Sequence, residues 1–176
     1  MRATRKKAFT LVEILISVAL SGLLLAAVAT AVHGSLKNQA ENTDIAAATQ
    51  AARFALDLIT REIRTAAAVD EHADPTTLTI VPPEDGSGTQ QIKYEHDAAS
   101  GSLVRRVTVN GSTTSQTLFG GQEDVRVQSF HAIYELGQDW QGLSCAKSVT
   151  IRMEFKVRNQ TLAVTASVAP RRNQLY

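Results

Sequence analysis

The feature that most constrains this chain is an apolar run from Ile14 to Val32, in which no side chain can ionise. Its roughly 19 residues would form a helix about 28 Å long, close to the ~30 Å hydrocarbon core of a bilayer. The run therefore predicts one membrane-spanning helix. Basic residues cluster before it and only Lys37 follows soon after, which predicts a cytoplasmic N-terminus and an external C-terminal domain. The cluster consists of Arg2, Arg5, Lys6 and Lys7.

Glu13 lies directly before this run. A carboxylate at the mouth of a membrane span costs about 3 kcal/mol to insert, so it is expected to have a function and a partner. One explanation is local, because an acidic side chain in the first turn gains about 0.3–1 kcal/mol from the helix dipole. That gain is smaller than the insertion cost. We therefore expect a second partner for Glu13.

Three interpretations of the N-terminus compete. The first is an ordinary signal peptide, cleaved near Ala29 or Ala31, that releases a secreted soluble binding domain. The second is a plain membrane anchor. The third is a prepilin signal, which a peptidase cuts on the cytoplasmic side of the apolar run. The stretch Ala8-Phe9-Thr10-Leu11-Val12-Glu13 resembles the prepilin motif: a small residue, then Phe-Thr-Leu, then Glu at the fifth mature position. This resemblance favours the third interpretation, although the family more usually has Gly in place of Ala8.

The resemblance implies cleavage between Ala8 and Phe9 by a prepilin peptidase that is also an N-methyltransferase, followed by N-methylation of Phe9. It also implies that Glu13 pairs with the N-terminal amine of a neighbouring subunit. Two unit charges about 4 Å apart gain roughly 4 kcal/mol at an effective dielectric of 20, which offsets much of the insertion cost. The pairing would favour one stagger between subunits.

The 176 residues suit one membrane helix and one small domain. We expect a leader at residues 1–8, a transmembrane and filament-core half of the helix at 9–32, an amphipathic half at 33–68 and a β-rich domain at 69–176. Loss of the four basic leader side chains changes the formal net charge from +1 to +1 − 4 = −3, which argues against nucleic acid binding through bulk charge. With one cysteine, Cys145, the domain has no internal disulfide.

Apolar side chains at helical spacing predict that the helix continues from Phe9 to about Ala68. We expect Leu56 to flank this stripe and Phe54 and Leu58 to widen it. The charged side chains nearby, Glu62 among them, fall largely outside it. Gly22 would weaken the helix by about 1 kcal/mol relative to Ala. Close packing of helices explains it best, with local unwinding on leaving the bilayer as the alternative. The stripe consists of Ile45, Ala48, Ala52, Ala55, Ile59 and Ile63.

Short alternating runs separated by turn residues follow from Asp70 onward and predict an antiparallel sheet. Asn110-Gly111 predicts a hairpin, because this pair favours a tight two-residue turn. We expect Gly137–Lys147 to be a loop anchored by Trp140. The predicted strands centre on Leu78–Ile80, Ile92–Tyr94, Leu103–Val109, Thr113–Phe119, Val125–Phe130, Val149–Val157 and Leu162–Val168.

A long N-terminal helix packed on a mostly antiparallel sheet resembles the type IV pilin fold, an α+β class. More narrowly, Ala52–Arg64 resembles a segment of the PilW-like minor pilins and of the J-type (GspJ-like) minor pseudopilin. So do Leu103–Val107, Glu123–Val125 and Ala169–Asn173. The resemblance implies a minor pilin of a type IV pilus-like filament that starts assembly or lies near the tip. The alternative within this class is the J-type pseudopilin of a type II secretion system.

Nothing in the sequence indicates an enzyme, a cofactor or a metal site. The four histidines lack metal-ligand spacing, and Cys145 has no nearby histidine to act as a base. We expect the acidic cluster Asp70–Asp74 to be a solvated link and the pair Arg105-Arg106 to be solvated. The implied partners are the prepilin peptidase, other major and minor pilins through the N-terminal helix, and the inner membrane. The protein would then move from the inner membrane into a pilus or pseudopilus. The histidines are His33, His72, His96 and His131.

Overall fold

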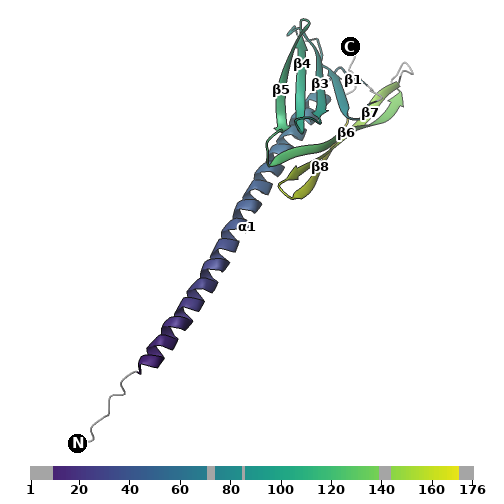
Figure 1. The fold of residues 1–176 in the computed structure, drawn as a ribbon. Helices are drawn as coiled ribbons and strands as arrows, with labels where there is room; N and C mark the ends of the chain where they lie inside the picture. Colours follow the sequence, from purple (N-terminus) through teal and green to yellow (C-terminus); the bar gives the residue numbers. More distant parts are fainter. Residues whose placement is uncertain (1–9, 71–73, 85, 139–143, 171–176) are drawn as a thin grey trace, which may run out of the picture. The chain divides into compact units, whose positions relative to one another are not determined.

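The computed structural model describes residues 10–70, 74–84, 86–138 and 144–170 (Figure 1). The expected α+β class is confirmed: a long N-terminal helix packs on antiparallel β-sheets. The chain divides into two compact units, Met1–Asp44 and Ile45–Tyr176, which we describe separately. The elements are α1 (Leu11–Thr65), β1 (Ala68–Asp70), β2 (Thr77–Val81), β3 (Thr89–Asp97), β4 (Ser102–Val109), β5 (Ser112–Gly120), β6 (Val125–Gln138), β7 (Ser144–Val157) and β8 (Gln160–Val168).

In the first unit, α1 carries a continuous apolar surface. Every large apolar side chain from Leu11 to Leu36 is more than half exposed. By length and composition this helix is able to cross a membrane. The helix runs without a break through Gly22 and Gly34, although glycine weakens a helix interior.

In the second unit, the predicted stripe of α1 is buried as expected. Ala52, Ile59 and Ile63 are fully buried, and Leu56 lies within the buried stripe. The prediction for Phe54 was wrong, because its side chain is 72% exposed. Each residue advances about 100° around a helix, so Leu56, four residues after Ala52 and three before Ile59, shares their face while Phe54 does not. The helix also ends at Thr65, before the expected Ala68.

The end of α1 follows from a change of hydrogen-bond partner. Ala66 N–H bonds the Ile63 carbonyl in a tighter turn, and Ala67 N–H then donates to the Val81 carbonyl at 2.9 Å. Ala68–Asp70 forms β1, which pairs with β2. Asp70 and Asp74 of the acidic cluster are exposed, as expected for a solvated link, although Asp70 also belongs to β1. Glu71 and His72 lie outside the described residues.

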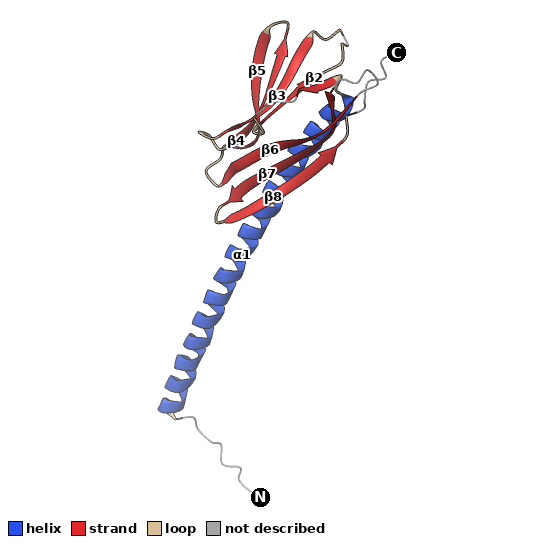
Figure 2. Cartoon of the chain, turned by 90° about the vertical axis from the view of Figure 1, so that its right-hand side faces the viewer, coloured by secondary structure: helices blue, strands red, loops and turns tan. Residues whose placement is uncertain are grey.

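The strands form two antiparallel sheets where we expected one. The five-stranded sheet has the order β1-β2-β3-β4-β5, and the three-stranded sheet has the order β6-β7-β8. The predicted hairpin at Asn110-Gly111 is confirmed, with φ of 49° and 80°, the left-handed values of a type I′ turn. Within this unit, β6, β7 and β8 lie along the C-terminal part of α1 (Figure 2).

The two sheets meet at the carbonyl of Gly101, which accepts the N–H groups of Gly121 and Val127 at 3.1 and 2.8 Å. Gly120 has a φ of 79°, and a Cβ there would lie 2.5 Å from the Gly101 oxygen, so this approach requires glycine. Phe119 and Phe155 add an edge-to-face contact with ring centroids 5.0 Å apart. The alternation of apolar residues in the sequence does not predict this contact between the two sheets.

The described residues of the predicted loop Gly137–Lys147 belong to strands. β6 continues to Gln138 and β7 begins at Ser144, so the two long strands pair beyond the limits that their apolar alternation suggested. A break in the register between Glu135 and Leu136 explains why the alternation is lost there. Trp140, the expected anchor, lies outside the described residues.

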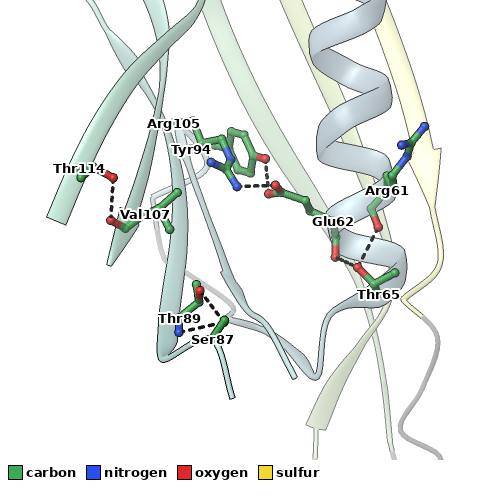
Figure 3. A network of polar contacts seen from close by, with 9 residues as sticks. All are labelled: Arg61, Glu62, Thr65, Ser87, Thr89, Tyr94, Arg105, Val107 and Thr114. Carbon is green, nitrogen blue, oxygen red and sulfur yellow. Dashed lines mark hydrogen bonds and ion pairs between the residues drawn. The ribbon is translucent and has the colours of Figure 1, made fainter. Parts of the chain in front are cut away.

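A polar cluster joins α1 to the five-stranded sheet (Figure 3). Glu62 accepts a hydrogen bond from Arg105 Nη2 to its Oε1 at 2.6 Å, and Tyr94 OH donates to its Oε2. The side chains of Glu62 and Arg105 are only 16% and 21% exposed. The expectation that Arg105 would be solvated was wrong, because the sequence pattern of a strand does not reveal an opposite charge on a distant helix. Arg106 is also paired, with Glu95.

This environment shifts two pKa values. Burial raises the pKa of the Tyr94 phenol, and the hydrogen bond to Glu62 and the charge of Glu62 raise it further. Burial of Arg105 opposes its charged form, but the hydrogen bond to Glu62 and the charge of Glu62 outweigh that effect, so its pKa is raised. Tyr94 is therefore neutral and Arg105 charged in the folded protein across the physiological range.

The core predicts a contrast between two faces of α1. Removal of the leader and the apolar span, so that the chain begins near Ser35, should leave a soluble monomer. In this truncated protein, Ile59→Ala or Ile63→Ala should lower the free energy of unfolding by about 2–4 kcal/mol. Phe54→Ala and Asp57→Ala should each lower it by well under about 1 kcal/mol, because both side chains are mostly exposed. Denaturant melts measure all four values. Comparable losses at Ile59 and Phe54 would contradict the packing described.

The polar cluster predicts an alkaline loss of stability. The folded-state pKa of Tyr94 lies above its unfolded value of about 10. The contribution of Tyr94 to the free energy of unfolding is therefore complete below about pH 10 and is lost progressively as the pH rises above it. The free energy of unfolding should fall with pH more steeply than in Tyr94→Phe, by a difference approaching about 1.4 kcal/mol per pH unit. Parallel pH-dependent melts of the two proteins test this, and equal slopes between pH 10 and 11.5 would refute it.

Candidate functional site

The start of α1 is fixed by a side-chain cap. Thr10 precedes the first helical residue, and its Oγ1 accepts a hydrogen bond from the Glu13 N–H at 3.3 Å. The Thr10 carbonyl also accepts from the N–H groups of Glu13 and Ile14 at 3.1 and 3.3 Å. These bonds satisfy amides that have no partner inside a helix. Glu13 therefore stands at the third helical position, where a Thr-x-x-Glu sequence forms a capping box.

The sequence prediction missed Thr10. Its signal was present, because Thr or Ser followed three residues later by Glu, just before an apolar run, is typical of a helix N-terminus. The prepilin resemblance implied roles for Ala8, Phe9 and Glu13 but not for Thr10. The cap uses the main-chain N–H of Glu13, and the interaction of its carboxylate with the helix dipole is a separate effect.

The structure describes one of the three predicted site residues, Glu13. Ala8 and Phe9 lie outside the described residues. Glu13 is exposed in the first turn of α1, and in the described part of the chain it forms no ion pair. Its carboxylate is thus free to meet a cation from outside the described residues or from another subunit.

A shallow hollow on α1 begins directly after Glu13 and extends over roughly three turns, from Ile14 to Leu25. Its volume is about 600 Å³, and it is lined by small and apolar residues. A Cβ at Gly22 would meet nothing within 4 Å, so no contact inside this unit explains the glycine. Ser17 and Ser21 satisfy their hydroxyls on the helix itself, at 2.8 and 2.7 Å. Small residues of this kind let helices approach closely in a membrane. The lining residues are Ile14, Ser17, Val18, Ser21, Gly22 and Leu25.

Two carboxyl groups of the second unit, those of Asp97 and Glu135, have local structural roles. Ser100 Oγ and the Ala99 N–H donate to Asp97, which lowers the pKa of that carboxyl. Ser148 and Lys147 lower the pKa of Glu135 in the same way. Over the described ranges, no three His, Cys, Asp or Glu side chains gather closely enough to hold a metal ion. The candidate site is therefore the N-terminal segment with Glu13.

Comparison with protein families identifies this segment. A family model described as the prokaryotic N-terminal methylation motif matches residues 3–29, which are 27 of the 176 residues. The matched range contains Ala8, Phe9 and Glu13 and most of the apolar run. No curated protein and no solved structure matches the chain.

The match supports a type IV pilin-like protein, either a pilin or a pseudopilin, that is a substrate of prepilin peptidase. Proteins with this motif are normally structural subunits, not enzymes. The motif implies assembly with other pilins, and together with the apolar helix it fits a subunit held in a membrane before it enters a filament.

Proposed function

We propose that this protein is a minor pilin of a type IV pilus-like filament, which helps to start assembly or lies near the tip. The observation that carries the proposal is the match to the prepilin-type motif over residues 3–29, together with an exposed, uncharged stretch of α1 at residues 14–32. The position in the filament rests on the resemblance of Ala52–Arg64 to the PilW-like minor pilins. The J-type pseudopilin of a type II secretion system is the second candidate, because the same segment resembles it.

The proposed life of the subunit has two stages. In the membrane, α1 spans the bilayer from the cytoplasmic side, and the domain that follows it lies in the periplasm. Cleavage between Ala8 and Phe9 removes the basic leader and leaves a cationic amine on Phe9. An assembly ATPase system then extracts the subunit, and the same apolar surface packs against neighbouring helices in the filament. The apolar part of α1 would thus anchor the subunit in the bilayer first and form helix contacts in the filament afterwards.

Glu13 would act at the second stage. At about 4 Å, its carboxylate and a neighbour's Phe9 amine attract each other by roughly 4 kcal/mol at an effective dielectric of 20. The observed cap joins the Thr10 side chain to the Glu13 N–H, so it does not require the negative charge of Glu13. Charge and cap can therefore be separated by substitution.

The processing step predicts a defined mature protein. Mass spectrometry of the membrane fraction should find N-methylated Phe9 at the N-terminus and no residues 1–8, whereas an ordinary signal peptide would give a start near Val32. Ala8→Gly should be cleaved at least as well, and Ala8→Leu should block maturation because a bulky side chain replaces a small one. An intact leader on the wild-type chain, with an active prepilin peptidase present, would refute the proposal.

The charge of Glu13 predicts an assembly defect. Glu13→Gln should be processed and accumulate in the membrane, since removing the charge relieves the insertion cost, yet should be depleted from sheared filaments. The measurement is the ratio of filament to membrane protein relative to wild type. A loss limited to the dipole interaction, under about 1 kcal/mol, would leave this ratio near normal.

Thr10→Ala is the matched control. It removes the cap, at a cost of about 0.5–2 kcal/mol to the helix end, but keeps the carboxylate. We expect Thr10→Ala to enter filaments better than Glu13→Gln. If Thr10→Ala were the more defective variant, or if Glu13→Gln partitioned as wild type, the charge-pairing role would be excluded for this subunit.

A further inference from the structure

A groove runs between α1 and the last strand of the three-stranded sheet, within the second unit. One wall is formed by Arg53, Leu56, Asp57 and Thr60 of α1, and the other by residues 163–166 of β8. Its volume is about 530 Å³, within the range of pockets that bury a ligand. In the described ranges, the Thr60 hydroxyl is buried and has no hydrogen-bond partner.

The wall on the sheet side is an open strand edge. In the described part of the chain, β8 pairs only with β7. A two-residue turn joins these strands, so Val157 and Gln160 form the hydrogen-bonded pair that closes the hairpin. Hydrogen-bonded and non-hydrogen-bonded pairs alternate from there. The N–H and C=O groups of Thr161, Ala163, Thr165 and Ser167 therefore point away from β7, along the free edge.

This edge lacks the features that normally block strand addition. The nine residues of β8 include no charged side chain and no proline, and the register with β7 has no bulge. Natural proteins usually protect an exposed edge with Lys, Pro, a bulge or a covering element. An uncharged, regular edge beside an open groove is thus an exception to be explained.

The inner face of β8 also lacks full cover. Leu162, Val164 and Ala166 face the core but are only half-buried, while the adjacent residues of β7 are fully buried. A further strand beside β8 would cover this row and lie against Leu56. β5, the other uncharged edge, offers no such row, because its residues 112–117 are all exposed.

These features define the chemistry of the occupant. An extended segment with apolar residues at every second position would place them against Leu162, Val164 and Leu56, and its other side chains in solvent. β8 has no charged side chain, Asp57 on the helix wall is paired with Arg61 at 3.6 Å, and Arg53 adds a positive charge to that wall. A segment without an excess of basic residues therefore fits best.

We propose that the free edge of β8 receives an extended strand from a different pilin-like subunit, which becomes the fourth strand of the β6-β7-β8 sheet. This inference rests on the proposed function, because the donor is a filament neighbour. The strand would supply partners for the main-chain groups of Thr161, Ala163, Thr165 and Ser167. It would also close the groove over Leu56.

Hydrogen–deuterium exchange of the full-length mature wild-type protein tests this directly. In detergent-solubilised protein from the membrane, the amides of Thr161, Ala163, Thr165 and Ser167 should exchange fast, while those of Leu162 and Val164, bonded to β7, exchange slowly. In sheared filaments all of these amides should be slow. Fast exchange at the four edge positions in filaments would overturn the proposal and leave the pilin assignment intact.

Substitution at one edge position separates the main chain from the side chain. Ala163→Pro removes an N–H that faces the free edge without removing a bond to β7, whereas Ala163→Ser keeps it. We expect Ala163→Pro to be processed normally but to fall in filaments by about three- to tenfold relative to Ala163→Ser, the factor for one lost main-chain hydrogen bond. Equal incorporation would overturn the proposal.

Two further outcomes are distinct. If the processed wild-type protein never enters filaments, the proposed function fails and the donor strand fails with it. If the edge amides become protected in the purified protein alone, as its concentration rises, the occupant is a second copy of this chain and the proposal of a different subunit is overturned.

Discussion

The structure of the second unit depends on burial of one stripe of α1. Alanine at positions 48, 52 and 55 lets the sheets approach the helix closely, and Ile59 and Ile63 fill the space farther along, fully buried. Burying a side chain the size of isoleucine contributes about 1.5–3 kcal/mol, so this stripe is a major source of stability. Both sheets contribute to the same core, and the close approach at Gly101 and Gly120 holds them together.

The polar cluster of Glu62, Tyr94 and Arg105 adds specificity to that apolar contact. Apolar surfaces tolerate a shift of one helix turn better than a carboxylate that must meet a guanidinium and a phenol at once. Buried ion pairs contribute little net stability compared with apolar residues of the same size, but removing one partner is costly. The cluster is best understood as fixing the register of α1 against the five-stranded sheet.

The monomer leaves two kinds of surface incomplete. The first unit exposes apolar side chains over the whole predicted span, and exposure on this scale indicates a membrane or protein partner. The second unit exposes the edge of β8 beside a groove. In the proposed filament, contacts through the helix alone would leave that edge open, and the proposed donor strand would cover it.

The sequence by itself determined the membrane-length helix, the position of Glu13, the buried stripe and the hairpin at Asn110-Gly111, because each depends on residues close together in the chain. The tertiary structure alone decided the rest. It paired Glu62 with Arg105, left Phe54 exposed, divided the strands between two sheets and opened the edge of β8. Those outcomes depend on which distant segments meet, and periodicity records the polarity of a face but not its partner.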